Sequence, residues 1–233
     1  MSKAYLTIDD VTSNRTKIIV DGLIERGIWP LMFATGKYLE EHWDEGIYAL
    51  KRGIILGNHS FSHPHFSELS LEESIQEIDE QEFLLEKLYL EANVQRTYKV
   101  FRFPYGDQGG DKKERLQAYL RNLGFCKLDD RMIQGPWYAE KGFYKDLDAY
   151  WTFDFTEYLL PKDSSYTIED CKKRIHNQDA LDGDYLLEDC GMGIVLIHDH
   201  PQTEAVAANY FFELVDYAIS NGVEFVAPKF IEI

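Results

Sequence analysis

Two histidines four residues apart, His59 and His63, are the first candidates for chemistry. If the segment forms a helical turn, residues at this spacing project to the same side. Two neutral imidazoles and one carboxylate make a three-ligand site with an open position, a common arrangement for catalytic zinc. A pair of surface or helix-capping histidines is the alternative for this spacing alone. His65 could compete as a ligand or lie on the rim of such a site.

The carboxylate pair Asp9 and Asp10 follows an apolar segment near the N-terminus. Two carboxylates in one pocket repel each other and raise the pKa of at least one of them, unless a cation relieves the repulsion. We expect the two neighbouring side chains to diverge, so that one Asp binds a metal and the other reaches a water molecule as general base. A solvated turn, in which an Asp caps the next helix, is the alternative.

Two further segments add a permanent positive charge and another histidine. In Arg102-Phe-Pro-Tyr105 the guanidinium could hold one Asp ionised and oriented, and the backbone N–H of Tyr105 could donate to an oxyanion. His198 ends an apolar segment, and Asp154 or Glu157 beside it would stabilise the protonated form that a general acid needs. The alternatives are an exposed ion pair of the arginine, worth about 0–1 kcal/mol, and a satisfied buried histidine.

These residues stand just after segments that the sequence predicts as strands. Short apolar runs alternate with segments of helical period, a pattern typical of βα units around a parallel sheet. The expected strands are 4–7, 29–34, 54–57, 100–103, 150–155, 194–198 and 223–227. We expect helices at 15–26 and from Ser70, where Ser-Leu-Glu-Glu forms a capping box before an apolar stripe. Function then lies at the carboxyl ends of the strands, whether the sheet is a barrel or open and doubly wound.

Composition limits the fold and the partners. The chain has 233 residues, 45% hydrophobic and 28% charged, so we expect one α/β domain over residues 1–233. A formal net charge of -17 repels phosphate backbones and anionic lipids, so we expect neither nucleic acid nor a membrane surface as partner. No run approaches the ~20 apolar residues of a membrane-spanning helix. We find no secretory signal and expect a cytoplasmic protein, or an extracellular one if a signal was trimmed.

The three cysteines, Cys126, Cys171 and Cys190, favour no special chemistry. They are too far apart for a Cys-x-x-Cys metal knuckle, and an odd number does not complete a disulfide framework. The segment 125–166 is the least regular part of the chain and could form a long loop with aromatic walls. Its aromatic residues include Trp137, Tyr138, Phe143, Tyr144, Tyr150, Trp151 and Tyr158.

In this order, the segments resemble the motifs of the polysaccharide deacetylases, the NodB-homology domain of carbohydrate esterase family 4. The motifs that carry the resemblance are Thr7-Ile-Asp9-Asp10 for TFDD, His59-Ser-Phe-Ser-His63 for H[ST]xxH, Arg102-Phe-Pro-Tyr105 for RxPY and Leu196-Ile-His198 for LxH. No single motif is specific, but their conjunction over residues 5–200 is. The resemblance implies a distorted (β/α) barrel of about seven parallel strands, a divalent metal, usually zinc, and hydrolysis of N-acetyl groups on an amino sugar.

The resemblance also implies a role for each matching residue. Asp9 would be the general base, and Arg102 would orient it; His198 would be the general acid. The metal ligands would be Asp10, His59 and His63. With these, we count Tyr105 and Asp154 among the catalytic residues. The expected substrate contacts are Pro104, Tyr105, Trp151, Glu157 and Tyr158.

One motif departs from the family. The family reads roughly WxxDxxDW, and this chain has Trp151-Thr-Phe-Asp154-Phe-Thr-Glu157-Tyr158, in which Glu-Tyr replaces the final Asp-Trp. Because Glu is one methylene longer and Tyr offers a hydroxyl and a smaller ring, substrate choice is the least transferable property. The aromatic residues between 137 and 158 could stack on sugar rings, although such clusters are more often core.

Two other functions fit the same residues. One is a cytosolic amidohydrolase of the same superfamily that acts on a small amide, a formyl-amino sugar or a nucleotide-linked sugar. The other is a catalytically silent sugar-binding protein, which would need a broken acid or base. A metal-free, allantoinase-like member is disfavoured because both His59 and His63 are present.

Overall fold

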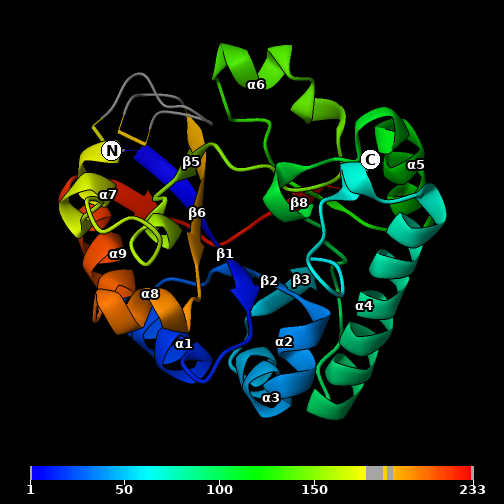
Figure 1. Cartoon of the computed structure of the whole chain (residues 1–233), viewed down its shortest axis with the longest axis horizontal. Helices are drawn as coiled ribbons and strands as arrows, with labels where there is room; N and C mark the ends of the chain where they lie inside the picture. Colours follow the sequence, from blue (N-terminus) through cyan, green and yellow to red (C-terminus); the bar gives the residue numbers. More distant parts are fainter. Residues whose placement is uncertain (1, 177–185, 188–190, 232–233) are drawn as a thin grey trace.

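The computed structural model describes residues 2–176, 186–187 and 191–231, and its centre is a parallel β-sheet (Figure 1). The sheet consists of β1 (Ser2–Val11), β2 (Leu31–Ala34), β3 (Ile55–Asn58), β5 (Phe153–Asp154), β6 (Met192–His198) and β7 (Val223–Phe225). The strand order is β3-β2-β1-β6-β5, with β7 also paired to β1, and every pair is parallel. A separate antiparallel pair joins β4 (Lys127–Leu128) to β8 (Phe230–Ile231).

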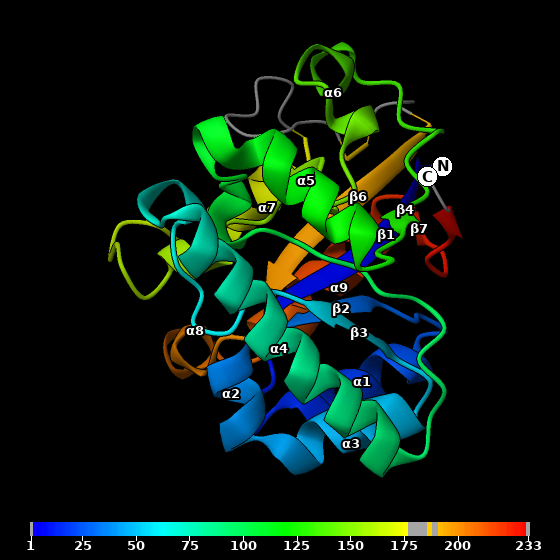
Figure 2. The ribbon, with the colours of Figure 1, turned by 90° about the vertical axis from the view of Figure 1, so that its right-hand side faces the viewer.

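Helices surround this sheet, as the two ribbon views show (Figures 1 and 2). They are α1 (Thr16–Glu25), α2 (Gly36–Glu41), α3 (Trp43–Lys51), α4 (Leu71–Ala92), α5 (Lys113–Asn122), α6 (Pro136–Glu140), α7 (Ile168–Arg174), α8 (Pro201–Val206) and α9 (Tyr210–Ser220). The expected helix at 15–26 is confirmed as α1, and the expected capping box begins α4. Ser70 Oγ accepts from the Glu73 N–H at 3.2 Å, and Glu73 accepts from the Ser70 N–H at 2.7 Å.

The predicted α/β class and parallel strands are confirmed, with one strand reduced to a single bridge. The segment expected as a strand at 100–103 pairs only through Phe101, which bridges Asn58 beyond the edge of β3. The chain turns at Pro104, a residue without an N–H, so the ladder does not continue. Ala149 N–H in turn donates to the Phe101 carbonyl at 2.8 Å. The two edges of the sheet therefore approach each other irregularly, as in a distorted barrel.

Side chains alternate along β1, and this alternation decides which of them face the interior. Leu6 and Ile8 pack with the surrounding helices in one buried cluster. Tyr5 packs with Phe33 and Leu196 in a second buried cluster. Because successive side chains of a strand point to opposite faces, Asp9 lies on the same face of the sheet as Tyr5. Burial on both faces, at about 1.5–3 kcal/mol for each large apolar side chain, holds this strand in place.

The segment 125–166 is irregular as predicted, but most of its aromatic residues form core rather than a sugar-binding wall. It contains only the short elements β4, α6 and β5 and single 3-10 turns, including η5 (Glu157–Leu159). Its members in the second buried cluster, or packed against that cluster, are Trp137, Tyr138, Phe143, Tyr144, Tyr150 and Trp151. Of the two alternatives for these residues, stacking on sugar rings or forming core, the first five form core, because they pack in the cluster that contains β4.

Two remaining expectations concern cysteines and membranes. Cys126 and Cys171 are buried, and Cys190 lies outside the described residues. No helix within the described ranges is long and apolar enough to cross a membrane.

Candidate active site

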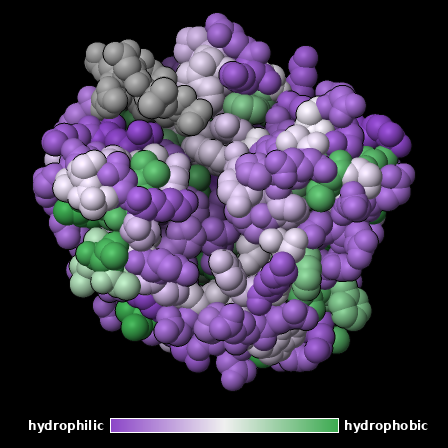
Figure 3. Space-filling model, viewed as in Figure 1, coloured by the Kyte–Doolittle hydropathy of each residue, from purple (hydrophilic) through white to green (hydrophobic). Residues whose placement is uncertain are grey.

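A cavity of about 390 Å³ opens at the carboxyl ends of β1 and β6. The face drawn in Figure 3 is mainly hydrophilic, and it is hollowed near its centre, where β1 ends in Figure 1. The cavity is lined by Asp9, Asp10, Tyr38, His59, His63, Tyr105, Trp151, Asp154, Tyr158, Lys162, Leu196, His198 and His200. Most residues that the sequence analysis selected thus come together from segments far apart in the chain.

Asp9 and Asp10 both line this cavity, although neighbouring side chains of a regular strand point to opposite faces. The register between β1 and β2 shifts between Ile8 and Val11, and Asp10 has a left-handed φ of 58°. Such a bulge adds a residue to one strand and re-aims its side chains. Asp9 keeps the strand alternation, while the bulge turns Asp10 toward the same space.

His59 and His63 lie in a loop after β3, not in the helical turn expected from their spacing. Ser60 and His63 both have left-handed φ values, 63° and 60°. The Ser60 N–H donates to Asn58 Oδ1 at 2.8 Å, and Ser60 Oγ accepts from the His63 N–H at 3.1 Å. These local hydrogen bonds compete with helical ones and hold the loop. The loop nevertheless brings the two imidazole rings to within 4.9 Å of each other.

Asp10, His59 and His63 form a group that fits a metal ion. One potential ligand atom from each lies within 4.8 Å of the others. His59 Nδ1 lies 2.8 Å from the Arg102 carbonyl, which selects the tautomer with the proton on Nδ1 and leaves Nε2 as a ligand atom. Asp10 Oδ1 is buried and has no hydrogen bond within the described part of the chain. An orphaned carboxylate oxygen between two imidazoles is the donor set that a divalent cation satisfies.

The protonation states of this group also suit a cation. Burial lowers the pKa of His63 to about 4, against the opposing effect of Asp10, so the imidazole is neutral at neutral pH. Burial raises the pKa of Asp10, but a hydrogen bond from His200 outweighs it and, with His63 and His59, holds that pKa well below its usual range. A metal ligand must be a neutral imidazole or an ionised carboxylate, and both conditions are met.

Arg102 lies next to Asp9, and the alternative of an exposed ion pair is wrong. Its side chain is only 1% exposed, and its Nη1 donates to Asp9 Oδ1 at 2.8 Å. The same nitrogen donates to Thr7 Oγ1 at 2.8 Å, and Nε donates to the Ala149 carbonyl at 2.6 Å. The guanidinium also lies 4.5 Å from the centroid of the Phe33 ring. These contacts fix the orientation of the guanidinium beside Asp9.

His198 is paired with Glu157, which resolves the two alternatives that the sequence left open. His198 Nδ1 lies 2.8 Å from Glu157 Oε1, and the His198 backbone N–H donates to the same oxygen at 2.8 Å. Burial lowers the pKa of His198, but the charge and hydrogen bond of Glu157 outweigh it and raise that pKa to about 10. Burial and the charge of Glu157 also raise the pKa of Asp154 to about 6. Asp154 accepts instead from the Thr156 N–H, at 2.7 Å.

Three of the expected substrate contacts line the cavity, and two do not. Tyr105, Trp151 and Tyr158 belong to the lining. Pro104 is buried in the turn after Phe103, and the fully buried Glu157 is engaged with His198. The prediction of a direct substrate contact is therefore wrong for both of these residues. Glu157 acts from behind the cavity wall, because its length lets it reach His198 from η5.

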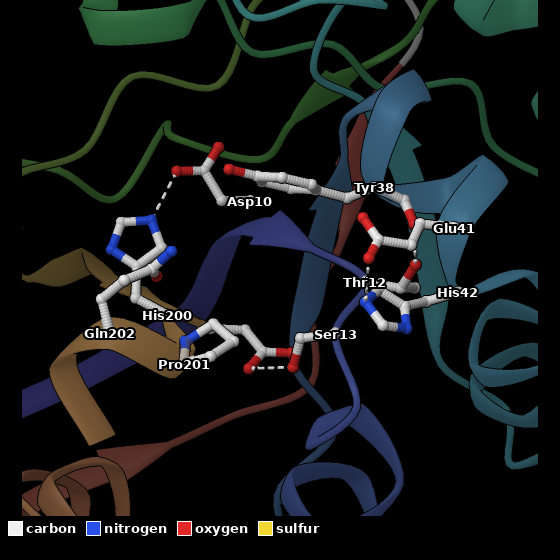
Figure 4. A pocket seen from close by; sticks show the side chains of 10 residues that line it. Asp10, Thr12, Ser13, Tyr38, Glu41, His42, His200, Pro201 and Gln202 are labelled. Atoms are coloured by element: carbon white, nitrogen blue, oxygen red, sulfur yellow. Dashed lines mark hydrogen bonds and ion pairs between the residues drawn. The ribbon is translucent and has the colours of Figure 1, made fainter. Parts of the chain in front are cut away.

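Sequence reasoning left His200 and Tyr38 without a role, although both lie beside Asp10. His200 Nε2 is 2.7 Å from Asp10 Oδ2, and its ring stacks on His198 at 4.8 Å. Figure 4 shows this hydrogen bond, with the Tyr38 side chain projecting toward the same carboxylate. The sequence did hold one indication for His200, since it stands two residues after His198, just after the end of the same strand. Tyr38 carried no such signal because α2 brings it in from outside the motifs.

A second, smaller cavity of about 160 Å³ shares Asp10, Tyr38 and His200 with the first (Figure 4). Its lining also includes Thr12, Ser13, Glu41, His42, Asp199, His200, Pro201 and Gln202. Ser13 Oγ and Thr16 Oγ1 each donate to Asp199 at 2.8 Å. This network fixes the start of α1 against the segment after β6, which carries His200.

His65 lies on the rim of the site, as one of its two predicted alternatives stated. It is about half exposed, and its ring stacks on Tyr105 at 3.9 Å. Its Nδ1 lies 3.6 Å from Asp107 Oδ2, and His65 is outside the group that could hold a metal. Tyr105 itself has a left-handed φ of 59° and packs edge-on against His63 at 4.5 Å.

Comparisons with known proteins point to one family. Residues 2–126 match the family model described as polysaccharide deacetylase. The peptidoglycan-N-acetylmuramic acid deacetylase PdaC of Bacillus subtilis (strain 168) is 32% identical over 116 residues, which cover 48% of this chain and 23% of PdaC. The matched regions cover only 29% and 23% of the first two curated relatives.

Solved structures share the fold. The polysaccharide deacetylase Bc1974 from Bacillus cereus has a TM-score of 0.66 at 21% identity, covering 97% of this chain and 92% of that one. BA3943 from Bacillus anthracis, described as a CE4 family pseudoenzyme, has a TM-score of 0.58 at 16% identity, covering 97% and 64%. At these identities the likeness establishes the architecture, and the chemistry has to be argued from the residues.

Proposed function

Since this chain belongs to the polysaccharide deacetylase family, we propose that it hydrolyses N-acetyl groups from amino sugars of a polysaccharide or oligosaccharide. One observation carries the proposal: a base fixed by an arginine and an acid fixed by a glutamate line the same cavity as a group that fits a metal. The base is Asp9 with Arg102, and the acid is His198 with Glu157. We further propose that residues 1–233 form a single domain.

We propose that the metal is zinc, held by Asp10, His59 and His63. When bound, a divalent metal polarises the amide carbonyl and makes a water molecule more acidic. The Arg102 carbonyl keeps the His59 ring in the required tautomer, and His200 holds the second oxygen of Asp10. The Arg102 carbonyl and His200 thus orient two of the ligands without binding the metal themselves, as hydrogen-bond partners of metal ligands usually do.

Asp9 would accept the proton of the attacking water. Its Oδ1 is held by Arg102 at 2.8 Å, so the orientation of the carboxylate is fixed. The second oxygen, Oδ2, lies 3.5 Å from His59 Nε2 and so faces the metal group. A base this close to the position of the water contributes typically 10²–10⁴-fold to the rate, about the range for positioned acid–base groups.

His198 would donate a proton to the leaving nitrogen. Amide nitrogen leaves as an amine only when it is protonated, so hydrolysis needs an acid on the side opposite the base. Glu157 keeps His198 protonated at neutral pH and leaves Nε2 as the donor, because Nδ1 is engaged. The turn at Tyr105 would present a backbone N–H to the oxyanion that develops on the carbonyl oxygen.

The test is acetate release from N-acetylglucosamine and its oligomers, with the metal first removed by a chelator and zinc then restored. We expect release to stop with the metal, return with zinc and increase with oligomer length. Absence of release from every length by the zinc-loaded protein would overturn the proposal. Activity on a small amide or formyl-amino sugar would then support an amidohydrolase of altered specificity, for which the Glu157-Tyr158 departure is the first suspect.

The pseudoenzyme among the structural neighbours makes a silent sugar-binding protein the second candidate. Such a protein would bind the oligomers without releasing acetate. The residues argue against it, because Asp9, Arg102 and His198 are all present and mutually oriented. Binding without turnover, measured on the same zinc-loaded sample, separates this candidate from the proposed hydrolase.

A further inference from the structure

Lys162 is a cation at the cavity that neither the motifs nor the proposed mechanism uses. It follows η5, where its backbone N–H donates to the Leu159 carbonyl at 2.9 Å. Its ammonium lies 5.2 Å from the centroid of the Tyr158 ring, within the range of a cation–π contact. No ion pair or side-chain hydrogen bond of Lys162 occurs within residues 2–176, 186–187 and 191–231. Tyr158 therefore holds the charge at the cavity wall without neutralising it.

The carboxylates of the same cavity are already engaged by the protein. Asp9 accepts from Arg102, Asp10 from His200 and Asp154 from the Thr156 N–H. Among the described residues that line the cavity, Lys162 is the only lysine or arginine. The lining thus offers one uncommitted positive charge to a ligand.

Lys162 also lies close to the group that is proposed to protonate the leaving nitrogen. The Tyr158 ring that contacts the ammonium packs edge-on against His198, with 5.2 Å between the ring centroids. In the proposed reaction the acetamido nitrogen must come within hydrogen-bond reach of His198. Tyr158 and Lys162 thus lie beside the place that this nitrogen would occupy, where a substituent on the neighbouring carbon of that sugar, or on the adjoining sugar, would meet them.

We propose that Lys162 selects N-acetyl amino sugars that carry a carboxylate beside the acetamido group or on the adjoining sugar. The inference rests on the proposed deacetylase function and adds a substrate class to it. The protein has a net charge of -17, which by itself repels an anionic glycan. A free ammonium beside the acid supplies local attraction where the carboxylate would lie, and a charge-assisted contact of this kind favours one ligand over its neutral analogue.

The experiment compares three glycans on the zinc-loaded protein. The first contains only N-acetylglucosamine, the second contains N-acetylmuramic acid, and the third alternates N-acetylglucosamine with glucuronic acid. KM and kcat for acetate release and the Kd of each glycan are measured for the wild type, Lys162→Gln and Lys162→Arg. Lys51→Gln is the matched control, because this exposed lysine at the end of α3 lies outside the cavity lining and removes the same charge.

We expect Lys162→Gln to raise KM and Kd for at least one acidic glycan about tenfold, with kcat and the neutral glycan unchanged. Lys162→Arg should restore most of the affinity, and Lys51→Gln should behave as the wild type. The acidic glycan that responds identifies whether the carboxylate belongs to the same sugar or to its neighbour. Equal effects of Lys162→Gln on neutral and acidic glycans, or no effect on any, would overturn the inference.

The failure of this inference is distinguishable from the failure of the proposed function. Acetate release from the neutral glycan, with no preference that depends on Lys162, rejects the substrate class and leaves the hydrolase intact. A higher Kd of Lys162→Gln for the acidic glycans, without acetate release by the wild type, supports selection by Lys162 and rejects the hydrolase.

Discussion

Two of the regions in which the protein buries polar and charged side chains differ in how completely the protein satisfies those side chains. The first, the catalytic cluster, consists of the buried residues Asp9, Asp10, His59, Arg102 and Glu157 and the partly buried residues His63 and His198. The second, the loop cluster, consists of Gln117, Lys127, Asp130, Asp146 and Asp148. Both place ionised groups away from water, which costs free energy unless each group finds partners.

In the loop cluster the buried polar atoms find their partners within the chain. Lys127 Nζ donates to the carbonyls of Phe143 and Asp146 at 2.6 and 2.7 Å and lies 2.7 Å from Asp130 Oδ2. Gln117 donates to Asp148 at 2.5 Å and accepts from the Leu147 N–H at 2.7 Å. These bonds tie the irregular segment after β4 to α5, so the cluster has a structural role.

In the catalytic cluster several buried atoms remain without a hydrogen bond. Among the described residues, Asp10 Oδ1, Arg102 Nη2 and Glu157 Oε2 are buried and unpartnered. Unmet polar groups beside a cavity are tolerated where a ligand completes them, whereas a saturated network needs none. The two clusters therefore differ in that the catalytic cluster leaves Asp10 Oδ1, on a residue that lines the cavity, for a ligand to complete.

The largest effect should come from removing a group that has no substitute in the chain. We expect His59→Ala to lose the metal and all measurable acetate release, because two ligands do not hold a catalytic zinc. Metal content by elemental analysis and acetate release measure the two effects. His65→Ala is the control, since this rim histidine lies outside the ligand group. Loss of bound metal in His65→Ala would contradict the assignment of the ligands.

A change of the base should separate metal binding from turnover. We expect Asp9→Asn to retain the metal and to lose about 10²–10⁴-fold in kcat, the usual contribution of a positioned base. Asn keeps an oxygen for the hydrogen bond from Arg102, so the fold should persist. Metal content, thermal unfolding and acetate release are measured on one preparation. A folded, metal-loaded Asp9→Asn variant with nearly wild-type kcat would refute this role.

The sequence predicted those parts of the two clusters that follow from local patterns, and it missed those that depend on contacts between distant segments of the chain. Asp9 and His198 were found because each follows an apolar strand, a local pattern, and parallel pairing of β1 with β6 then places Asp9 opposite His198. The bulge at Asp10 and the loop at His63 were not predicted, because spacing alone does not reveal left-handed φ values. These values follow from hydrogen bonds and pairings made by other parts of the chain.

The loop cluster escaped sequence analysis for a related reason. Its members come from α5, β4 and the segment before β5, and no short motif joins them. A lysine such as Lys127 is normally exposed, so its burial is visible only when its partners are placed around it. The fold class was predictable from periodicity, whereas long-range polar partners, including the Glu157–His198 pair, required the structure.

A variant in the loop cluster tests whether that cluster is purely structural. We expect Lys127→Met to lower the free energy of unfolding by about 3–5 kcal/mol, because it leaves Asp130 buried without its cation. The kcat per folded molecule should stay within about twofold, since the partners of this lysine among the described residues, Phe143, Asp146 and Asp130, lie outside the cavity lining. Urea unfolding and acetate release below the transition measure the two quantities. The control is Lys145→Met, at an exposed lysine nearby, which should change neither the free energy of unfolding nor kcat. A Lys127→Met enzyme that is stable but inactive would show that Lys127 serves the reaction and not the fold.

The smallest expected effect at neutral pH, and the most specific, concerns Glu157. The pKa of His198 is raised from 6.5 to about 10, so stabilisation by its protonated form is fully present below pH 6.5 and is lost as the pH rises through about 10. Glu157→Gln keeps an oxygen for the His198 N–H but removes the charge that raises this pKa. We therefore expect the alkaline limit of activity to move down by more than one pH unit, with a loss of about tenfold or less in kcat at neutral pH.

The pH profile distinguishes this role of Glu157 from simple packing. A structural defect would lower activity at every pH and lower the free energy of unfolding equally above and below the titration. Loss of the charge alone should instead leave activity on the acidic side nearly intact, where His198 is protonated without help. Glu157→Asp, which restores the charge on a side chain shorter by one methylene, should move the alkaline limit partly back. A Glu157→Gln profile identical in shape to the wild type would show that another carboxylate sets the pKa of the acid; Asp10, whose charge has the next largest effect on His198, is the first candidate, followed by Asp154.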